Sequence, residues 1–142
     1  MNNPAPPFGV RIRGTGSCVP ERILTNDDLS KVMDTTDEWI FQRTGIRERR
    51  VCDPMTEGTF TMARDALKNA LDAAEMKGSD LDLIIVGTVT AEMTCPSVAA
   101  RVGAALGAVP AAAFDLSAAC CGFVYSINLA QALIQSGQFR SI

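Results

Sequence analysis

This chain of 142 residues contains no histidine. A Ser-His or Cys-His pair therefore cannot form within it, and any catalysis that needs an imidazole must recruit that group from outside the chain. Its five cysteines are an odd number, and none are spaced as C-x-x-C. This usage argues against a disulfide framework and against a structural zinc site, and it is typical of a protein of the reducing cytoplasm. We expect no metal site.

The chain also lacks the long apolar and long basic segments that mark membrane and nucleic-acid-binding proteins. No apolar run approaches the roughly 18 residues of a membrane span. Residues 1–7 have neither the basic region nor the apolar region of a secretory signal. The net charge is −3, and without an extended basic run nucleic acid is not an expected partner. We predict a cytoplasmic protein with no membrane and no nucleic acid among its partners.

The residues that are present are sufficient for a packed core, because 47% are hydrophobic and only 20% are charged. Apolar patterning predicts strands that alternate with helices. The expected strands are 10–13, 46–51, 83–86 and 111–116, and the expected helices are 26–33, 36–44, 57–77, 96–106 and a last one that ends near Gly137. We expect Gly78 to end the helix over 57–77. This order predicts an α/β fold with a mixed, mostly parallel sheet and helices on both faces.

The most informative stretch is residues 114–123 (FDLSAACCGF). It reads as a buried strand, a sharp turn, two cysteines and the start of a long apolar helix that is buried on most sides. A thiol at a helix N-terminus is near unpaired backbone N–H groups, which favour its thiolate form and make it a nucleophile. The alternative is that both cysteines are small apolar filler between helix and sheet. The pattern by itself leaves both interpretations open.

Four blocks of this sequence closely resemble β-ketoacyl-acyl-carrier-protein synthase III. They are residues 36–49 (TDEWIFQRTGIRER), 82–88 (DLIIVGT), 96–97 (PS) and 114–123, and they occur in the family's order. The resemblance covers only the N-terminal half of a family member. It implies a thiolase-like fold, so residues 1–142 are expected to be an incomplete N-terminal condensing-enzyme domain whose C-terminal half is absent. Residues 138–142 look like the approach to a further strand, which agrees with this expectation.

The resemblance also implies the chemistry. An acyl group, with acetyl as the expected primer, passes from coenzyme A (CoA) to a cysteine and condenses with malonyl-acyl-carrier protein as CO₂ leaves. Acyl-CoA is then a substrate, and no cofactor is expected. The family's nucleophile falls on Cys120, because residues 117–120 (SAAC) align with its Ala-Ala-Ala-Cys. Cys121 departs from the small aliphatic residue that is usual there, and we interpret it as filler.

Three further positions follow from the resemblance. Trp39 and Arg43 match residues that contact CoA, where the indole stacks on adenine and the guanidinium meets phosphate. Thr35 falls beside them. Cys95 falls where the family places a residue, often aromatic, that crosses a dimer interface to close the acyl pocket. The alternative for Trp39 is a core aromatic. For the arginines it is a solvated basic face, an interpretation we prefer for Arg49 and Arg50.

The family's His and Asn, and its oxyanion-hole glycine N–H, lie in the second half. We therefore expect this chain to be inactive by itself and to work with a complementary C-terminal half that carries the His and Asn, in a homodimer of such pairs. Two alternatives stay open. One is a non-catalytic half that binds acyl groups or a partner. The other is a different thiolase-fold condensing enzyme, such as a type III polyketide synthase or a relative of hydroxymethylglutaryl-CoA synthase.

Overall fold

The computed structural model describes residues 9–142, so the segment in which we found no secretory signal lies outside the described residues. The chain divides into two compact units. One consists of residues 19–58, and the other joins the segment up to Cys18 to residues 59–142. The expectation of one incomplete domain over 1–142 stays a prediction.

The unit of residues 19–58 is a small hairpin with two helices. Its elements are β1 (Ile23–Thr25), α1 (Asn26–Ser30), α2 (Asp37–Thr44) and β2 (Glu48–Arg50). β1 and β2 pair antiparallel, with Ile23 opposite Arg50. Both helices begin at threonine caps, because the hydroxyl of Thr25 accepts from the Asp28 N–H and that of Thr36 accepts from the Trp39 N–H. The helix starts are as predicted, whereas β1 was missed and the strand over 46–51 is shorter than predicted.

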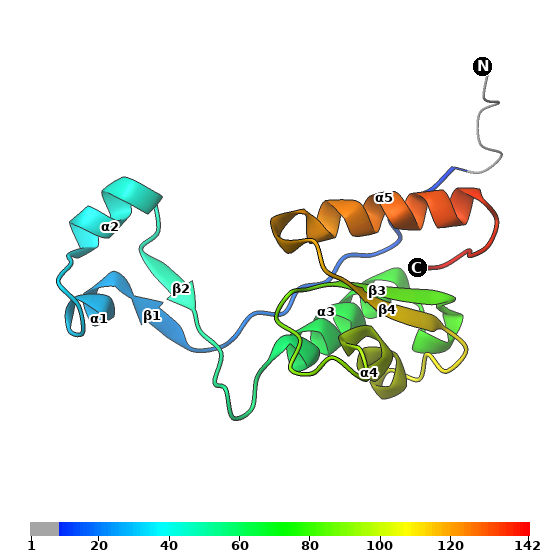
Figure 1. The fold of residues 1–142 in the computed structure, drawn as a ribbon, viewed down its shortest axis with the longest axis horizontal. Coiled ribbons are helices and arrows are strands. Elements are labelled where there is room, and N and C mark those ends of the chain that lie inside the picture. Colours follow the sequence, from blue (N-terminus) through cyan, green and yellow to red (C-terminus); the bar gives the residue numbers. More distant parts are fainter. Residues whose placement is uncertain (1–8) are drawn as a thin grey trace, which may run out of the picture. The chain divides into compact units, whose positions relative to one another are not determined.

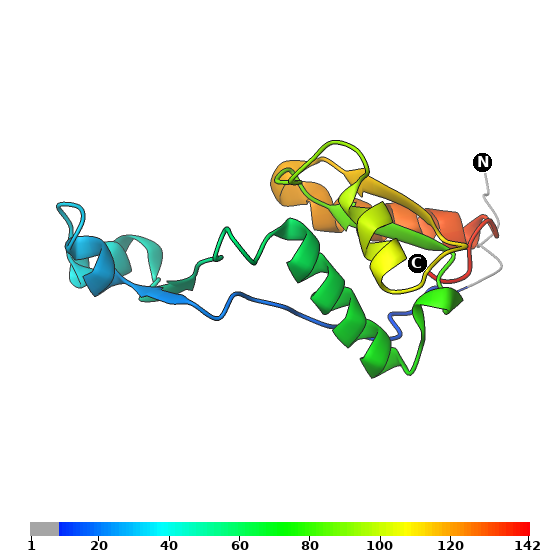
Figure 2. The same cartoon turned by 90° about the horizontal axis from the view of Figure 1, so that it is seen from below.

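The larger unit is an α/β layer structure. It contains α3 (Thr59–Ala74), the 3₁₀ turn η1 (Gly78–Asp80), β3 (Leu83–Gly87), α4 (Val98–Ala105), β4 (Ala112–Leu116), the 3₁₀ turn η2 (Ala119–Cys121) and α5 (Gly122–Gln135). β3 and β4 are parallel, with Leu83 opposite Ala112 and Gly87 opposite Leu116. Figures 1 and 2 show α5 on one face of this pair and α3 with α4 on the other. The predicted α/β class with helices on both faces is confirmed.

The core of this unit lies between β3 and the helices α3 and α4. One cluster of buried residues there consists of Leu71, Leu81, Ile84, Ala99 and Ala108. Burial of such apolar side chains is the main favourable contribution to folding. The core therefore holds β3 in place, and the carboxyl ends of β3 and β4 lead into the loops that carry Cys95 and Cys120.

Three local predictions are wrong. Residues 10–13 form no strand, because a strand exists only with a hydrogen-bonded neighbour and none of the described strands pairs with this segment. Gly78 does not end the long helix, since α3 stops at Ala74 and Glu75 takes the left-handed conformation (φ 54°). α4 begins at Val98 rather than Pro96, because the Ser97 hydroxyl accepts from the Ala100 N–H and caps it.

The burial predicted for the last helix is also wrong for the chain by itself. Only Gly122 is buried in α5. Large apolar side chains of its first two turns are exposed: Phe123 (74%), Val124 (64%), Tyr125 (55%) and Ile127 (46%). An apolar helix face of this kind is expected to have a partner in a stable assembly.

Candidate functional site

The turn between β4 and α5 presents Cys120. β4 ends at Leu116, Ala119 adopts a left-handed conformation (φ 45°), and Cys120 sits in the 3₁₀ turn. Cys121 is the N-cap residue of α5, and its N–H donates to the Ala118 carbonyl (3.0 Å). Cys120 therefore lies two residues before the helix that it was expected to begin. Both thiols are exposed, so the interpretation of either cysteine as buried filler does not hold in this structure.

The start of α5 is held against the end of β3. Gly122 is buried, and the three atoms nearest to a Cβ placed on it would all belong to Gly87. The Ser126 hydroxyl donates to the Gly122 carbonyl (2.7 Å), which uses one of the helix's own acceptors. The close contact of two glycines fixes where the cysteine turn leaves the sheet.

The loop that carries Cys95 leaves the same edge of the sheet. It follows β3, whereas the Cys120 turn follows β4, and the carboxyl ends of parallel strands lie at one edge. The Thr88 N–H continues the pairing by donating to the Leu116 carbonyl (3.1 Å). Cys95 is exposed. In parallel α/β sheets this edge is where ligands bind.

Charged side chains fix both ends of the Cys95 loop. The Glu92 carboxylate accepts from the Phe60 N–H (2.8 Å) and from Arg101 Nη1 (3.0 Å), and the Arg101 guanidinium lies over the Phe60 ring. The backbone N–H of Phe60, with help from Arg101, holds the pKa of Glu92 below its ordinary value. Asp115 of β4 accepts from the backbone N–H groups of Val98 and Ala99, each at 2.8 Å. Sequence reasoning missed both carboxylates, because their partners lie far away along the chain.

In the unit of residues 19–58, α2 brings two of the predicted residues together. The Arg43 guanidinium lies over the Trp39 ring, with Cζ 4.8 Å from its centroid. Trp39 is 54% exposed, so it is not a core aromatic. Thr35 precedes the cap residue of α2, and its hydroxyl oxygen is buried with no hydrogen-bond partner.

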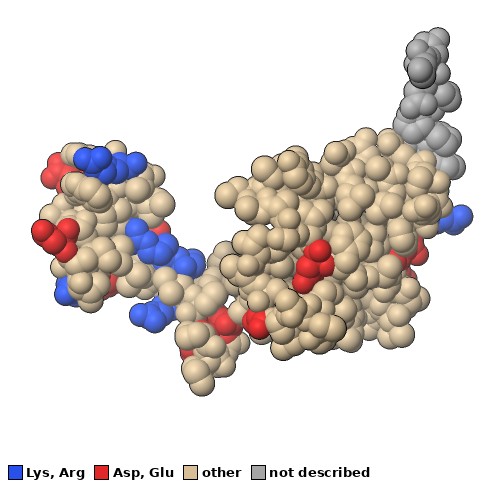
Figure 3. Space-filling view, in the orientation of Figure 1, with Lys and Arg blue, Asp and Glu red and all other residues tan. Residues whose placement is uncertain are grey.

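The prediction of a solvated basic face is wrong for Arg49. Its guanidinium donates to the Asn26 side-chain oxygen (2.8 Å) and to the Leu24 carbonyl. Arg50 is exposed, yet it donates to the backbone carbonyls of Pro20 and Glu21. On the face shown in Figure 3, Lys and Arg side chains gather over residues 19–58, whereas the surface of residues 59–142 is mainly uncharged.

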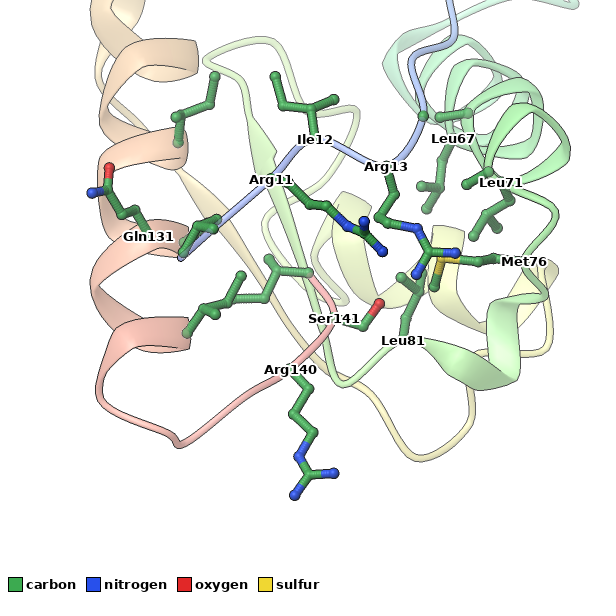
Figure 4. Close-up of a pocket in the computed structure, with 18 residues that line it drawn as sticks. Arg11, Ile12, Arg13, Leu67, Leu71, Met76, Leu81, Gln131, Arg140 and Ser141 are labelled. Atoms are coloured by element: carbon green, nitrogen blue, oxygen red, sulfur yellow. The ribbon is translucent and has the colours of Figure 1, made fainter. Parts of the chain in front are cut away.

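Two cavities lie in the larger unit. The first, of about 420 Å³, lies where residues 10–14 pass α3 and α5. Its wall is mainly apolar, and Figure 4 shows Arg11 and Arg13 extending into it while Arg140 points away. The second, of about 380 Å³, is lined by all five residues of β3 and by none of β4. It therefore lies along the edge of β3 that faces away from β4.

Within residues 9–142, no group of three or more His, Cys, Asp and Glu side chains is placed to hold a metal ion. None of the helices over the same residues is both long enough and apolar enough to cross a bilayer. The cytoplasmic location stays a prediction.

Comparison with known proteins gives one consistent result. The family model of 3-oxoacyl-[acyl-carrier-protein (ACP)] synthase III matches residues 114–142, which include the Cys120 turn and α5. The β-ketoacyl-[acyl-carrier-protein] synthase III of Caldanaerobacter subterraneus subsp. tengcongensis is 53% identical over 131 residues, which are 92% of this chain and 39% of that protein. A synthase III of Bacillus anthracis is 50% identical over 95% of this chain and 43% of its own length.

Solved structures agree with the sequence matches. The 3-oxoacyl-[acyl-carrier-protein] synthase III from Aquifex aeolicus VF5 superposes with a TM-score of 0.89 at 46% identity, over 92% of this chain and 42% of that one. The priming β-ketosynthase from the R1128 polyketide pathway superposes with a TM-score of 0.88 at 36% identity, over 95% and 42%. The chain spans about two fifths of the length of these relatives.

Proposed function

This chain belongs to the 3-oxoacyl-[acyl-carrier-protein] synthase III family and corresponds to the N-terminal part of its members, and from that premise we propose that Cys120 accepts an acyl group from CoA. The observation that carries the proposal is the exposed Cys120 thiol on a tight turn directly before α5. The Cys120 sulfur attacks the thioester carbonyl, a new carbon–sulfur bond forms, and the CoA thiolate leaves and takes up a proton. The acyl group is thereby stored on the protein.

We propose that α2 recognises the nucleotide end of CoA. Trp39 offers an exposed indole for stacking on adenine, and Arg43 offers a guanidinium for phosphate. Thr35 lies directly before the cap residue of this helix, and it is proposed to form part of the same site. Cys95, in a loop at the edge of the sheet that also carries Cys120, is proposed to border the acyl pocket.

The condensation itself needs groups that this chain does not contain. The carbanion left by decarboxylation of malonyl-acyl-carrier protein, and the oxyanion that forms at the acyl carbonyl, both need hydrogen-bond donors. With no histidine in the chain, we propose that a complementary polypeptide supplies the His and Asn. Exposed apolar side chains of α5 and the two cavities of the larger unit support a partner of this kind.

The proposal is tested on the purified chain with and without the C-terminal part of a family synthase. We expect acetyl-CoA to add one acetyl group to Cys120. The condensation product should form only in the mixture of the two parts. Sedimentation equilibrium of that mixture should show a two-fold assembly. A stable monomer of 15.1 kDa would contradict the assembly. A monomer that condensed acetyl-CoA with malonyl-acyl-carrier protein would also contradict the need for a second half.

A further inference from the structure

Two aromatic residues of α2 each pack against an arginine, and the two arginines differ in whether a carboxylate compensates their charge. Arg43 lies over Trp39, and Arg47 of the following segment lies over Phe41, with Cζ 3.9 Å from the ring centroid. Arg47 also donates to the Asp37 carboxylate (2.8 Å). Within residues 9–142, no carboxylate lies within ion-pair distance of Arg43. The charge of Arg47 is therefore compensated, and that of Arg43 is available to an anion.

A single buried side chain connects the elements of this unit. Asn26 is 0% exposed. Its amide nitrogen donates to Asp37 Oδ1 (2.8 Å) and to the Ile46 carbonyl (2.7 Å), and its amide oxygen accepts from Arg49 Nη2 (2.8 Å). Because buried polar groups are costly when unpaired, these three bonds specify one arrangement of α1, α2 and β2.

We propose that Asn26 and Asp37 are positioning residues for the recognition of the adenine nucleotide by α2. Asp37 is the first residue of α2, and its two carboxylate oxygens are held by Asn26 and Arg47. In this arrangement Arg47 packs on Phe41 and holds the helix in place. Trp39 and Arg43 are then the residues of α2 that face the ligand. The inference rests on the proposed CoA site and adds the residues that set its geometry.

The physical reason is the shortness of α2. A helix of eight residues is not stable by itself, so its direction depends on the contacts at its ends. The Thr36 cap satisfies one backbone N–H, but a cap does not fix how the helix is rotated about its axis. The bonds from Asp37 to Asn26 and Arg47 do fix that rotation, and with it the direction in which Trp39 and Arg43 point.

The experiment measures binding of adenosine 3′,5′-bisphosphate to the full 142-residue chain by fluorescence, because Trp39 is its only tryptophan. All variants are compared at a temperature at which circular dichroism shows them folded. We expect Asn26→Ala to raise the dissociation constant roughly 2- to 30-fold. Asn69→Ala is the matched control, since Asn69 makes one exposed bond to the Ser17 carbonyl outside this unit. An unchanged constant in Asn26→Ala would overturn the proposal.

Asp37→Asn distinguishes positioning from simple charge attraction, because the two explanations predict opposite changes in the affinity for the nucleotide. It keeps an oxygen to accept from Asn26 but removes a negative charge, so simple charge attraction expects tighter binding of the anion. Positioning expects weaker binding, because Arg47 is released and the rotation of α2 is no longer fixed. Tighter binding in Asp37→Asn would therefore overturn the positioning role.

A double-mutant cycle separates this inference from the site itself. If Asn26 acts through the face that carries Arg43, the losses in Asn26→Ala and Arg43→Ala are not additive, whereas independent effects add. Additive losses would contradict positioning. If the unmodified chain binds no nucleotide, or if Arg43→Ala binds as well as the unmodified chain, then the proposed CoA site fails and the inference fails with it.

Discussion

Gly87, the last residue of β3, lies directly against Gly122, the first residue of α5. A Cβ placed on Gly87 would be 3.1 Å from the carbonyl carbon of Gly122 and 3.2 Å from its oxygen. Since these are backbone atoms, they cannot move aside as a flexible side chain would. The absence of a side chain at Gly87 is what lets the Cys120 turn sit close to the end of the sheet.

Gly87→Ala is expected to shift the start of α5 and to destabilise the fold by about 1–3 kcal/mol, as overpacking does. Urea titration measures the loss of stability, and the rate of Cys120 modification by iodoacetamide reports the shift at the start of α5. Gly9→Ala is the control, because nothing lies within 4 Å of a Cβ placed there. Equal stability and equal modification rates in the two variants would show that the glycine contact does not position the turn.

Cys120, not Cys121, is expected to receive the acyl group. Exposure does not distinguish them, because both cysteines are exposed, but adjacent residues in a 3₁₀ turn point about 120° apart. With the complementary half present, Cys120→Ala should abolish acetyl transfer and Cys121→Ala should retain most of it. Peptide mass spectrometry locates the acetyl group, and preferential acetylation of Cys121 would refute the assignment.

Asp115→Asn is expected to lower the free energy of unfolding by about 1–2 kcal/mol, as the loss of a helix cap does. One carboxylate oxygen becomes an amide NH₂ group, which cannot accept from the N–H of Val98 or of Ala99. Asp72→Asn is a suitable control, because its ion pair with Lys68 is exposed and should change stability little. Similar losses in the two variants would contradict the capping role of Asp115.

Glu92 is expected to make stability depend on pH in the acid range. Its pKa is held below the ordinary value of 4.5, first by the Phe60 N–H and then by Arg101. A lowered pKa means that the folded state is stabilised above the unfolded value, and that this stabilisation is lost as the pH falls below 4.5 through the folded value. Glu92→Gln should therefore show a weaker loss of stability on acidification in thermal unfolding. Parallel stability curves for the two proteins would contradict this expectation.

Much of the fold could be predicted from the sequence, because the signals that define it are local. The continuous apolar run at 83–86 predicted a covered strand, and structure gives the parallel strand β3. The threonines before acidic first turns predicted both short helices, since capping involves residues three positions apart. The four sequence blocks, including the motif around Cys120, predicted the family.

Tertiary structure decided what depends on partners far away along the chain. Asn26 stands at the start of a predicted helix, and only the tertiary structure shows that it is buried and bonded to Asp37, Ile46 and Arg49. Residues 10–13 alternate as a strand should, yet they form none because no neighbour pairs with them. The sequence by itself determined which segments can be helix or strand and that two adjacent cysteines stand on the turn before the last helix. Which polar groups meet depended on the long-range packing that brings their elements together.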